Sequence, residues 1–364
     1  MVLSTVALYR YELPLTAPLR LDGESLQSRH GLLLRLDTAE GRVGWGEAAP
    51  LPGFSAESLD DVVAHARSVA PKWTGTGLPD GPKALERAPE ILAGADGPAS
   101  FRFATESALV GLLAGATDKT LPDVLGTPQN TVALNALITS PEEDGPEQAA
   151  RYRKRGYRAV KVKVGRRPVD REVETLREIR AALGDKVALR ADANRAWSLE
   201  EAVAFAKDTQ DLPLAYVEEP LSDPEELSEF GGRVECPVAL DETTRETGPE
   251  ILREHPTVSA VVLKPTLLGG VQATRRWSRG AQEAGVTPVL SAAYESGVGL
   301  RMLLALAAIG PKVPVGLSPY DRLAADVLQV PLQLSGPTVP VSPNVPSTVT
   351  VDEERLALVD SFSS

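Results

Sequence analysis

From residue 131 onward, the chain repeats one pattern, in which a short apolar and β-branched run precedes a stretch of helical periodicity. Eight such runs are predicted to be strands: residues 132–138, 159–164, 187–191, 215–218, 238–241, 260–264, 288–290 and 313–317. The helical stretches between them, such as 170–183 and 199–209, are long enough for right-handed crossovers between parallel strands. This α/β alternation predicts a (β/α)8 TIM-type barrel of about 200 residues, which we assign to residues 126–328.

The residues before this barrel show a different order of elements. Strand-like runs at 5–9, 31–36 and 41–47 precede helix-period stretches at 58–69 and 100–114, which a Pro/Gly-rich loop separates. Strands followed by helices indicate an α+β domain, assigned to residues 1–125. The proline-rich segment 329–364 contains a strand-like run at 348–351, so we expect it to pack back on the α+β domain and complete it.

The charge balance limits the partners of the chain. Its 38 lysines and arginines against 50 aspartates and glutamates give a net charge of −12, which repels nucleic acid and anionic lipid. Apolar residues make up 43%, typical of a chain that buries a large core, and this excludes disordered and fibrous classes. We expect no nucleic-acid partner, and the oligomeric state stays open.

Apolar runs and cysteine usage indicate the compartment. The longest apolar runs, such as 302–309, fall far short of the roughly 20 residues of a membrane span, and the N-terminus lacks a basic-then-apolar signal pattern. Cys236 is the single cysteine, so neither an intramolecular disulfide nor a cysteine-rich zinc site is possible. We therefore expect a cytoplasmic protein that makes no membrane contact.

Charged side chains interrupt the predicted barrel strands at corresponding places. In residues 159–164, period-two alternation puts Lys161 and Lys163 on one face and valines on the other. Later runs are each closed by one charged residue: Asp192, Glu218, Asp241 and Lys264. From Lys163 onward these positions are 23–29 residues apart, near the length of one βα unit, so they should meet at the C-terminal mouth of the barrel.

Such a cluster has a chemical meaning. Three converging carboxylates would repel one another and raise their own pKa values unless a cation were bound, and oxygen ligands favour Mg²⁺, with Mn²⁺ also possible. The three histidines show no HExxH-type spacing, so any catalysis must depend on lysines and carboxylates. Lysines on opposite sides of one metal could remove a proton next to a carboxylate and stabilise the enediolate that forms. A single strand-end carboxylate is more often a helix cap, and a lone lysine pair could protect an edge strand. Five charged side chains at corresponding positions of successive strands instead favour a functional site.

The chain resembles the muconate lactonizing enzyme subgroup of the enolase superfamily over nearly its whole length. The resemblance is carried by the lysine-x-lysine strand, the Asp, Glu and Asp that follow, and the lysine of the sixth strand. Residues 44–55 are similar to a loop of that subgroup's capping domain, and residues 262–267 are similar to its sixth strand. Within the subgroup, these segments are similar to the dehydratases of menaquinone biosynthesis. The resemblance implies a barrel with an N-terminal α+β capping domain.

The resemblance also implies a role for each charged residue. Asp192, Glu218 and Asp241 would be Mg²⁺ ligands, with Asn194, Glu219 and Glu242 orienting them. Lys163 would take the α-proton of a small-molecule carboxylate and return it to the departing hydroxyl, a syn dehydration of 2-succinyl-6-hydroxy-2,4-cyclohexadiene-1-carboxylate. Lys264 would act as a cation near the ring and the enediolate, and Lys161 would support Lys163 by like-charge repulsion.

Substrate contacts are expected from loops around the mouth. Loop 19–31, which contains Arg20 and Arg29, and loop 50–55 should close over the site and exclude water. The candidate contacts are Arg29, Ser55, Ser291, Glu295 and Gly316. Solvated surface arginines are an equally good interpretation of Arg20 and Arg29. Ser291 is followed by two alanines, whereas the relatives often carry consecutive serines at this place.

Other functions fit parts of the pattern. The same lysine pair could racemise N-succinylamino acids, while dipeptide epimerases tend to carry an Asp-x-Asp where this chain has only Asp321. A Schiff-base aldolase using Lys264 would leave Asp192, Glu218 and Asp241 unexplained. A non-catalytic binding protein would leave both the lysines and the carboxylates unexplained.

Overall fold

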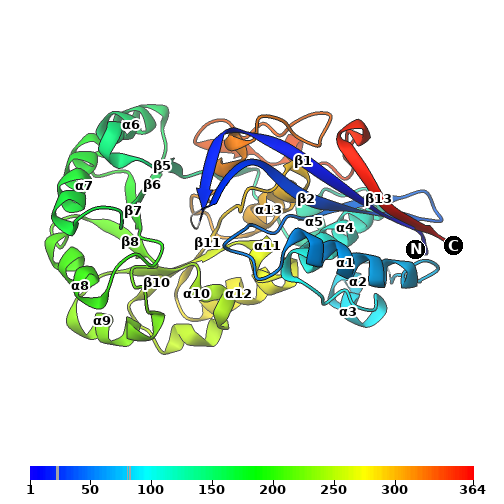
Figure 1. Cartoon of the computed structure of the whole chain (residues 1–364), viewed down its shortest axis with the longest axis horizontal. Helices are drawn as coiled ribbons and strands as arrows, with labels where there is room; N and C mark the ends of the chain where they lie inside the picture. Colours follow the sequence, from blue (N-terminus) through cyan, green and yellow to red (C-terminus); the bar gives the residue numbers. More distant parts are fainter. Residues whose placement is uncertain (22–23, 80, 82) are drawn as a thin grey trace.

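An antiparallel sheet joins the two ends of the described chain, in the strand order β13-β1-β2-β3. The computed structural model describes residues 1–21, 24–79, 81 and 83–364. The strands are β1 (Leu3–Leu21), β2 (Glu24–Thr38), β3 (Val43–Ala48) and β13 (Leu356–Ser363). Figure 1 shows β13 lying along β1, with the N and C ends close together. β1 and β2 are longer than predicted, because their pairing continues as a hairpin to Leu21 and Glu24.

The predicted C-terminal strand at 348–351 is wrong. Val351 forms one isolated antiparallel bridge with Leu328, and the regular strand begins only at Leu356. The apolar residues of the predicted run instead bury beside Leu328, since Val349 and Val351 belong to a hydrophobic cluster with Val327. The β-branched pattern therefore reports burial at this place and not strand pairing.

Helices cover the inner face of the antiparallel sheet. They are α1 (Leu59–Val69), α2 (Lys83–Glu86), α3 (Ala88–Ile91), α4 (Ala99–Thr117) and α5 (Leu121–Leu125). Ser58 and Asp61 form a capping box that starts α1. α4 is buried along most of its length because it packs on β3 and also touches α11 and α12. A Cβ at Gly46 would lie 1.8 Å from the Ala104 carbonyl oxygen, so only glycine allows β3 to approach α4 this closely.

A curled sheet of seven parallel strands forms the second part, in the order β11-β10-β9-β8-β7-β6-β5 (Figure 1). Its strands are β5 (Ala136–Ile138), β6 (Ala159–Lys163), β7 (Ala188–Asp192), β8 (Leu214–Glu218), β9 (Val238–Leu240), β10 (Val258–Leu263) and β11 (Thr287–Leu290). The helices are α6 (Pro141–Arg155), α7 (Val169–Leu183), α8 (Leu199–Asp208), α9 (Leu227–Arg233), α10 (Thr243–Glu246), α11 (Pro265–Leu268), α12 (Val271–Glu283) and α13 (Gly297–Ile309). The predicted alternation of parallel strands and helices is confirmed.

Two predicted strands differ in the structure. Residues 132–138 divide into β5 and a separate strand, β4 (Thr131–Ala133), which pairs antiparallel with β12 (Thr338–Pro340). The predicted strand at 313–317 is wrong as a regular strand: Val315 and Gly316 form single parallel bridges to Leu134 and Ser291. Pro314 has no amide proton and its carbonyl accepts from Arg190, which removes the ladder positions that a full strand would need.

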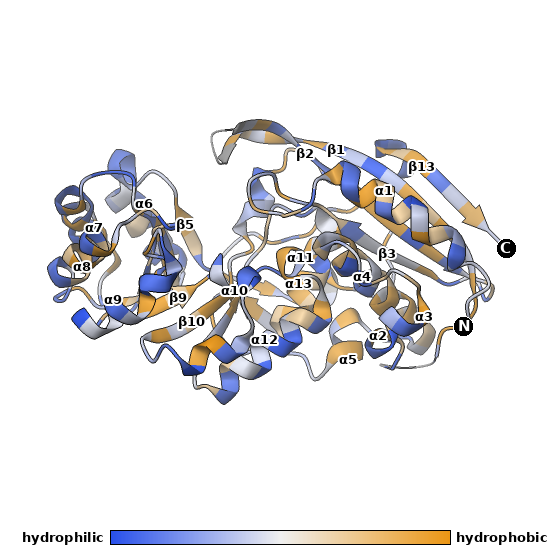
Figure 2. Cartoon of the chain, turned by 60° about the horizontal axis from the view of Figure 1, so that its bottom comes forward, coloured by the Kyte–Doolittle hydropathy of each residue, from blue (hydrophilic) through white to orange (hydrophobic). Residues whose placement is uncertain are grey.

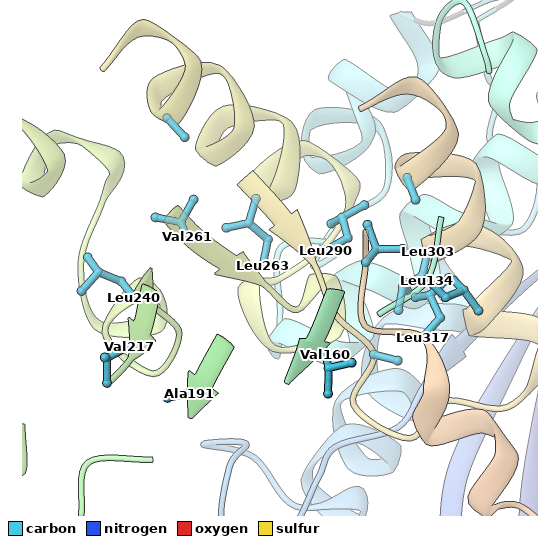
Figure 3. Close-up of a cluster of buried hydrophobic side chains, with 14 of the residues drawn as sticks. Leu134, Val160, Ala191, Val217, Leu240, Val261, Leu263, Leu290, Leu303 and Leu317 are labelled. Carbon is cyan, nitrogen blue, oxygen red and sulfur yellow. The ribbon is translucent and has the colours of Figure 1, made fainter. Parts of the chain in front are cut away.

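Successive side chains of β6 point to opposite faces, so that one set lies in the hydrophobic core and the other set at the candidate site. Val160 and Val162 belong to the large hydrophobic cluster that also contains Leu176 and Ile179 of α7. Figure 3 shows side chains of this cluster on successive strands, from Val160 to Leu290, and Figure 2 shows strongly hydrophobic colour on β10. Lys161 and Lys163 therefore point away from the helices. Across the described residues, no helix combines the length and apolar character of a membrane span.

A buried carboxyl group on α4 makes the stability of this fold depend on pH. Glu106 accepts a hydrogen bond from the Gln272 amide at the start of α12, at 2.9 Å. Burial raises its pKa to about 7, against the opposing effects of the α12 amides and Arg102. A raised folded-state pKa means that the folded protein binds the extra proton, so stability falls as pH rises from 4.5 to about 7, by about 3 kcal/mol.

We expect Glu106→Gln to remove this pH dependence, because glutamine keeps an acceptor for the Gln272 amide but cannot ionise. Urea unfolding should give variant and wild type similar stability at pH 4, and a variant more stable by about 1–3 kcal/mol at pH 8. Glu178→Gln, at an exposed position of α7, is the matched control. A variant less stable than wild type at pH 8 would mean that the ionised carboxylate supports α12.

Candidate active site

Two lysines of β6 face two carboxylates at the ends of the neighbouring strands. The Lys163 Nζ lies 2.7 Å from Asp192 Oδ2. The Lys161 Nζ lies 2.7 Å from the same oxygen and 3.0 Å from Glu218 Oε1. Sheet register produces this arrangement, because Lys163 pairs with Asp192 across β6 and β7, and Asp192 pairs with Glu218 across β7 and β8.

A third lysine lies farther along the sheet, on the other side of these carboxylates in strand order. Lys264 follows β10, and its Nζ contacts Asp241 Oδ2 directly after β9. Asp192, Glu218 and Asp241 are almost completely buried, at 0%, 0% and 2% exposure. The six predicted charged residues therefore come together at the carboxyl ends of consecutive strands, with a lysine on each side of the carboxylates.

The charges of this cluster shift one another's protonation. Burial alone would raise the pKa of Asp192, but Lys161 and Lys163 lower it well below its usual range. Burial and the charge of Asp192 raise the pKa of Glu218 to about 8. Burial opposes the charges of Lys161 and Lys264, yet neighbouring carboxylates, Asp192 first for Lys161 and Asp241 first for Lys264, raise the pKa of both ammonium groups.

Residues one or two positions after the carboxylates hold the cluster in place. Asn194 contacts the Lys163 Nζ through its Oδ1 and donates to Glu242 Oε1 at 3.2 Å. Glu219 accepts from the amides of Asp241 and Thr243, at 2.8 and 2.7 Å. Asn194 and Glu219 have φ angles of 46° and 40°, a region that costs non-glycine residues energy and is concentrated at functional sites.

A cavity of about 490 Å³ opens beside the lysines. Seven of the predicted site residues line it: Lys161, Lys163, Asp192, Asn194, Lys264, Ser291 and Gly316. Phe54 of the loop 50–55 also lines it, and its ring lies 5.8 Å from the Lys264 Nζ. The α+β part therefore supplies one wall of a cavity whose floor belongs to the parallel sheet.

Three other predicted substrate contacts have their polar groups engaged within the protein. The Arg29 guanidinium donates to the carbonyls of Ala49, Pro50 and Tyr294, at 2.9, 3.0 and 3.2 Å. Ser55 Oγ accepts from the Leu51 amide at 2.9 Å. Glu295 accepts from the Thr266 hydroxyl and the Ala293 amide, both at 2.6 Å. None of the three lines the described cavity, and the side chain of Arg20 lies outside the described residues, as do positions 22 and 23 of loop 19–31.

Glu47, a buried acid that the sequence analysis did not single out, makes a connection similar to that of Arg29. Glu47 of β3 accepts from the amides of Ser296 and Gly299, at 2.8 and 2.7 Å, where α13 begins. A carboxylate at a helix N-terminus is favoured by the free amides and the helix dipole. Arg29 and Glu47 therefore tie the α+β part to the cavity loop that runs from Ser291 into α13.

The lining residues that sequence reasoning missed include Asn135, Arg166, Tyr294 and Arg322. Tyr294 has a φ of 64°, a strain that has no signature in a single sequence. Asn135 accepts from Arg190 at 3.1 Å inside the curled sheet, and it was missed because it lies within the run 132–138 that was predicted as one strand. Arg166 and Arg322 follow no periodic pattern, so nothing in the sequence separated them from solvated arginines.

The donor set fits a hard divalent cation. Asp192 Oδ1 and Glu218 Oε2 are buried and have no hydrogen-bond partner, and a buried anionic oxygen of this kind requires a cation or a donor. Within the described ranges, no three histidine, cysteine or acidic side chains are already gathered as a coordination cluster. The lysine ammonium groups contact the other oxygens of these two carboxylates, Asp192 Oδ2 and Glu218 Oε1, so Oδ1 and Oε2 are the oxygens left for a bound metal.

The parallel sheet and its lysine-flanked carboxylates together define an enzyme of the enolase superfamily. Residues 145–355 match the family described as Enolase C-terminal domain-like, and residues 3–94 match the MenC N-terminal domain family. The o-succinylbenzoate synthases of Yersinia pseudotuberculosis serotype O:1b (strain IP 31758) and Yersinia pestis (strain Pestoides F) are each 32% identical over 329 residues, covering 89% of this chain and 93% of the relative. The chain therefore belongs to the o-succinylbenzoate synthase family.

Solved structures share the fold at lower sequence identity. The L-Ala-D/L-Glu epimerase of Bacillus subtilis has a TM-score of 0.82 at 24% identity, covering 96% of this chain and 99% of its own. The muconate lactonizing enzyme of Pseudomonas fluorescens has a TM-score of 0.82 at 24% identity, with 97% and 98% coverage. An enolase-superfamily member from Roseovarius nubinhibens ISM, complexed with magnesium, has a TM-score of 0.86 at 21% identity, with 100% and 99% coverage.

Proposed function

We propose that this chain is a Mg²⁺-dependent o-succinylbenzoate synthase. It would dehydrate 2-succinyl-6-hydroxy-2,4-cyclohexadiene-1-carboxylate to 2-succinylbenzoate in menaquinone biosynthesis. The observation that carries the proposal is the placement of Lys163 and Lys264 on the two sides of the buried carboxylates, in a chain of this family. The magnesium complex of a structural neighbour supports the choice of metal.

Asp192, Glu218 and Asp241 would hold the Mg²⁺, and Mn²⁺ has the same ligand preference. When bound, the metal supplies a positive charge that stabilises the negative charge developing on the substrate carboxylate. Glu219 keeps the Asp241 backbone in place through its amide bond at 2.8 Å. Asn194 contacts Lys163 and donates to Glu242, the residue after Asp241, so this pair would help to hold the orientation of Lys163 and Asp241.

Lys163 would act as base and then as acid on one face of the ring. Its neutral Nζ takes the proton from the carbon that bears the carboxylate, and its ammonium returns that proton to the hydroxyl as the C–O bond breaks. Water leaves and the ring becomes aromatic, so the elimination is syn. Lys264 stays protonated beside the developing charge, and the ring of Phe54 lies over its ammonium group.

Two structural expectations belong to the same proposal. We infer that residues 126–328 form a closed (β/α)8 barrel, supported by the bridges of Val315 and Gly316 to Leu134 and Ser291. Residues 1–125 and 329–364 would form the capping domain, supported by the pairing of β13 with β1. Ser291 and Gly316 would contact the substrate, whereas Arg29, Ser55 and Glu295 would act by holding the cavity loops.

The test is a direct assay of the purified protein. Incubation with Mg²⁺ and the cyclohexadiene carboxylate should produce the ultraviolet change of aromatisation, EDTA should stop it, and added Mg²⁺ should restore it. Turnover that persists in EDTA would contradict the metal dependence. Absence of turnover in Mg²⁺ would overturn the proposed reaction.

N-succinylamino acid racemisation is the second candidate. It is favoured by Lys264, which lies across the carboxylates from Lys163 and could protonate the opposite face of an enediolate. Incubation of a single enantiomer in D₂O would show this activity as loss of optical rotation together with deuterium uptake at the α-carbon. Rotation that stays constant would exclude it.

A further inference from the structure

The proposed substrate carries two carboxylates, and the metal site accounts for only one. The ring carboxylate is the one next to the proton that Lys163 would remove. The succinyl chain ends in a second carboxylate, several bonds away. An anionic group that enters a partly buried cavity needs a cationic or hydrogen-bonding partner there.

The cavity contains cations of two kinds. Three lysines line it, and each is paired with a carboxylate: Lys161, Lys163 and Lys264. Two arginines also line it, Arg166 and Arg322. In the described part of the chain, neither arginine has a carboxylate within salt-bridge distance, and the lysines beside them have already used the three acids of the site. The arginines are therefore the cavity cations that remain for a ligand.

Of these two, Arg322 has the geometry of a recognition group. It is half-buried at the end of the 3-10 turn Ser318–Arg322, directly after the bridged residues 315–316. Its Nε is fully buried and has no hydrogen-bond acceptor. A buried N–H without a partner costs about 1–3 kcal/mol, so a carboxylate that accepted from it would recover this cost.

The turn that carries Arg322 is hydrogen-bonded to β1. Its carbonyl accepts from the Thr16 hydroxyl at 3.3 Å, and the Ala324 amide donates to the Pro14 carbonyl at 2.8 Å. Tyr320, in the same turn, donates to Asp326 Oδ2 at 2.6 Å. The turn therefore connects β1 to the cavity wall, and the guanidinium starts from a defined position.

Tyr294 and Arg322 both line the cavity. Burial raises the pKa of the Tyr294 hydroxyl, while the charges of Arg322 and Lys264 act against that rise. Arg322 and Lys264 line the same cavity as Tyr294. Arg166, by contrast, is exposed and donates to the Thr139 carbonyl at 2.9 Å, so its charge is solvated at the rim.

We infer that Arg322 binds the terminal carboxylate of the succinyl chain and so selects succinyl-bearing substrates. This inference rests on the proposed function. The planar guanidinium can offer two parallel N–H donors to one carboxylate, which fixes the direction of the chain while the ring carboxylate lies at the metal site. Arg322 is thereby a specificity-determining residue, outside the proton-transfer machinery.

The test compares two ligands that differ only at the end of the chain. In 2-succinylbenzoate the chain ends in a carboxylate, and in 2-butanoylbenzoate it ends in a methyl group. Calorimetric titration of the Mg²⁺-loaded full chain should show that Arg322→Met weakens 2-succinylbenzoate binding by about 10- to 100-fold. The affinity for 2-butanoylbenzoate should change less than about twofold. Arg171→Met, at an exposed site on α7, controls for loss of one positive charge.

The outcomes separate this inference from the proposed function. If Arg322→Met lost equal affinity for both ligands, Arg322 would only shape the cavity wall. If the variant still preferred 2-succinylbenzoate to 2-butanoylbenzoate as strongly as the wild type does, the proposed role of Arg322 would also be overturned. If Arg166→Met removed the preference while Arg322→Met kept it, the carboxylate partner would be Arg166 and the inference would be wrong. A wild-type protein that binds neither ligand would overturn the proposed function itself.

Discussion

Lys163→Ala is expected to lower the dehydration rate by about 10²–10⁴-fold, because the variant lacks the group that takes and returns the proton. The fold should be unaffected. Asp192 Oδ2 keeps the Lys161 Nζ at 2.7 Å, so the substitution leaves no buried carboxylate without a counter-ion. Initial rates followed by the ultraviolet change, together with circular dichroism of the variant, measure the two expectations.

Chemical rescue makes this prediction specific for a base. A small primary amine such as ethylamine should enter the space left by the side chain and restore part of the activity of Lys163→Ala, increasingly at higher pH. Ethylamine should not affect the wild type. A matched Lys312→Ala variant, at an exposed position after α13, should keep full activity. Retention of more than a tenth of the wild-type rate by Lys163→Ala would show that another group is the base.

Asp241→Asn is expected to weaken divalent-metal binding by at least about 100-fold. Loss of residues that merely orient metal ligands already costs 10–100-fold, and this change removes a ligand charge itself. It also takes from Lys264 the carboxylate that it contacts. Mn²⁺ titration followed by electron paramagnetic resonance reports the free ion directly, so the measurement does not depend on turnover.

A nearby acid provides the control for this change. Asp321 is exposed in the turn Ser318–Arg322, and Asp321→Asn removes the same charge from the chain without touching the carboxylate cluster. Its Mn²⁺ affinity should match that of the wild type. An Asp241→Asn protein with wild-type affinity would remove Asp241 from the ligand set, while Asp192 and Glu218 could still be tested in the same way.

The sequence was sufficient to predict the charged cluster because the register of parallel strands determines which residues lie side by side. Once residues 159–163 and 188–192 are parallel neighbours, Lys163 must lie beside Asp192, and Glu218 follows on the next strand. The period of two along β6 then decides which side chains face the core. These relations depend only on strand geometry, so one chain without relatives reveals them.

The cavity wall could not be predicted in the same way. Arg29 lies in β2 and Arg322 in a 3-10 turn, and neither segment has a periodicity that distinguishes these arginines from solvated ones. Arg29 donates to three backbone carbonyls, whereas the buried Nε of Arg322 has no hydrogen-bond partner. That difference depends on which distant segments pack beside them. The predicted strands at 313–317 and 348–351 are wrong for a related reason, since these segments form single bridges with distant parts of the chain and not a continuous ladder.

The pairing of β13 with β1 has a consequence for synthesis of the chain on the ribosome. Thr5 and Ser363 lie side by side although they are 358 residues apart along the chain. Until residues 356–363 have been made, β1 exposes an open hydrogen-bonding edge, and such edges recruit other nascent chains. Nascent chains that still lack residues 356–363 therefore expose this edge, and contacts of such long range are made slowly.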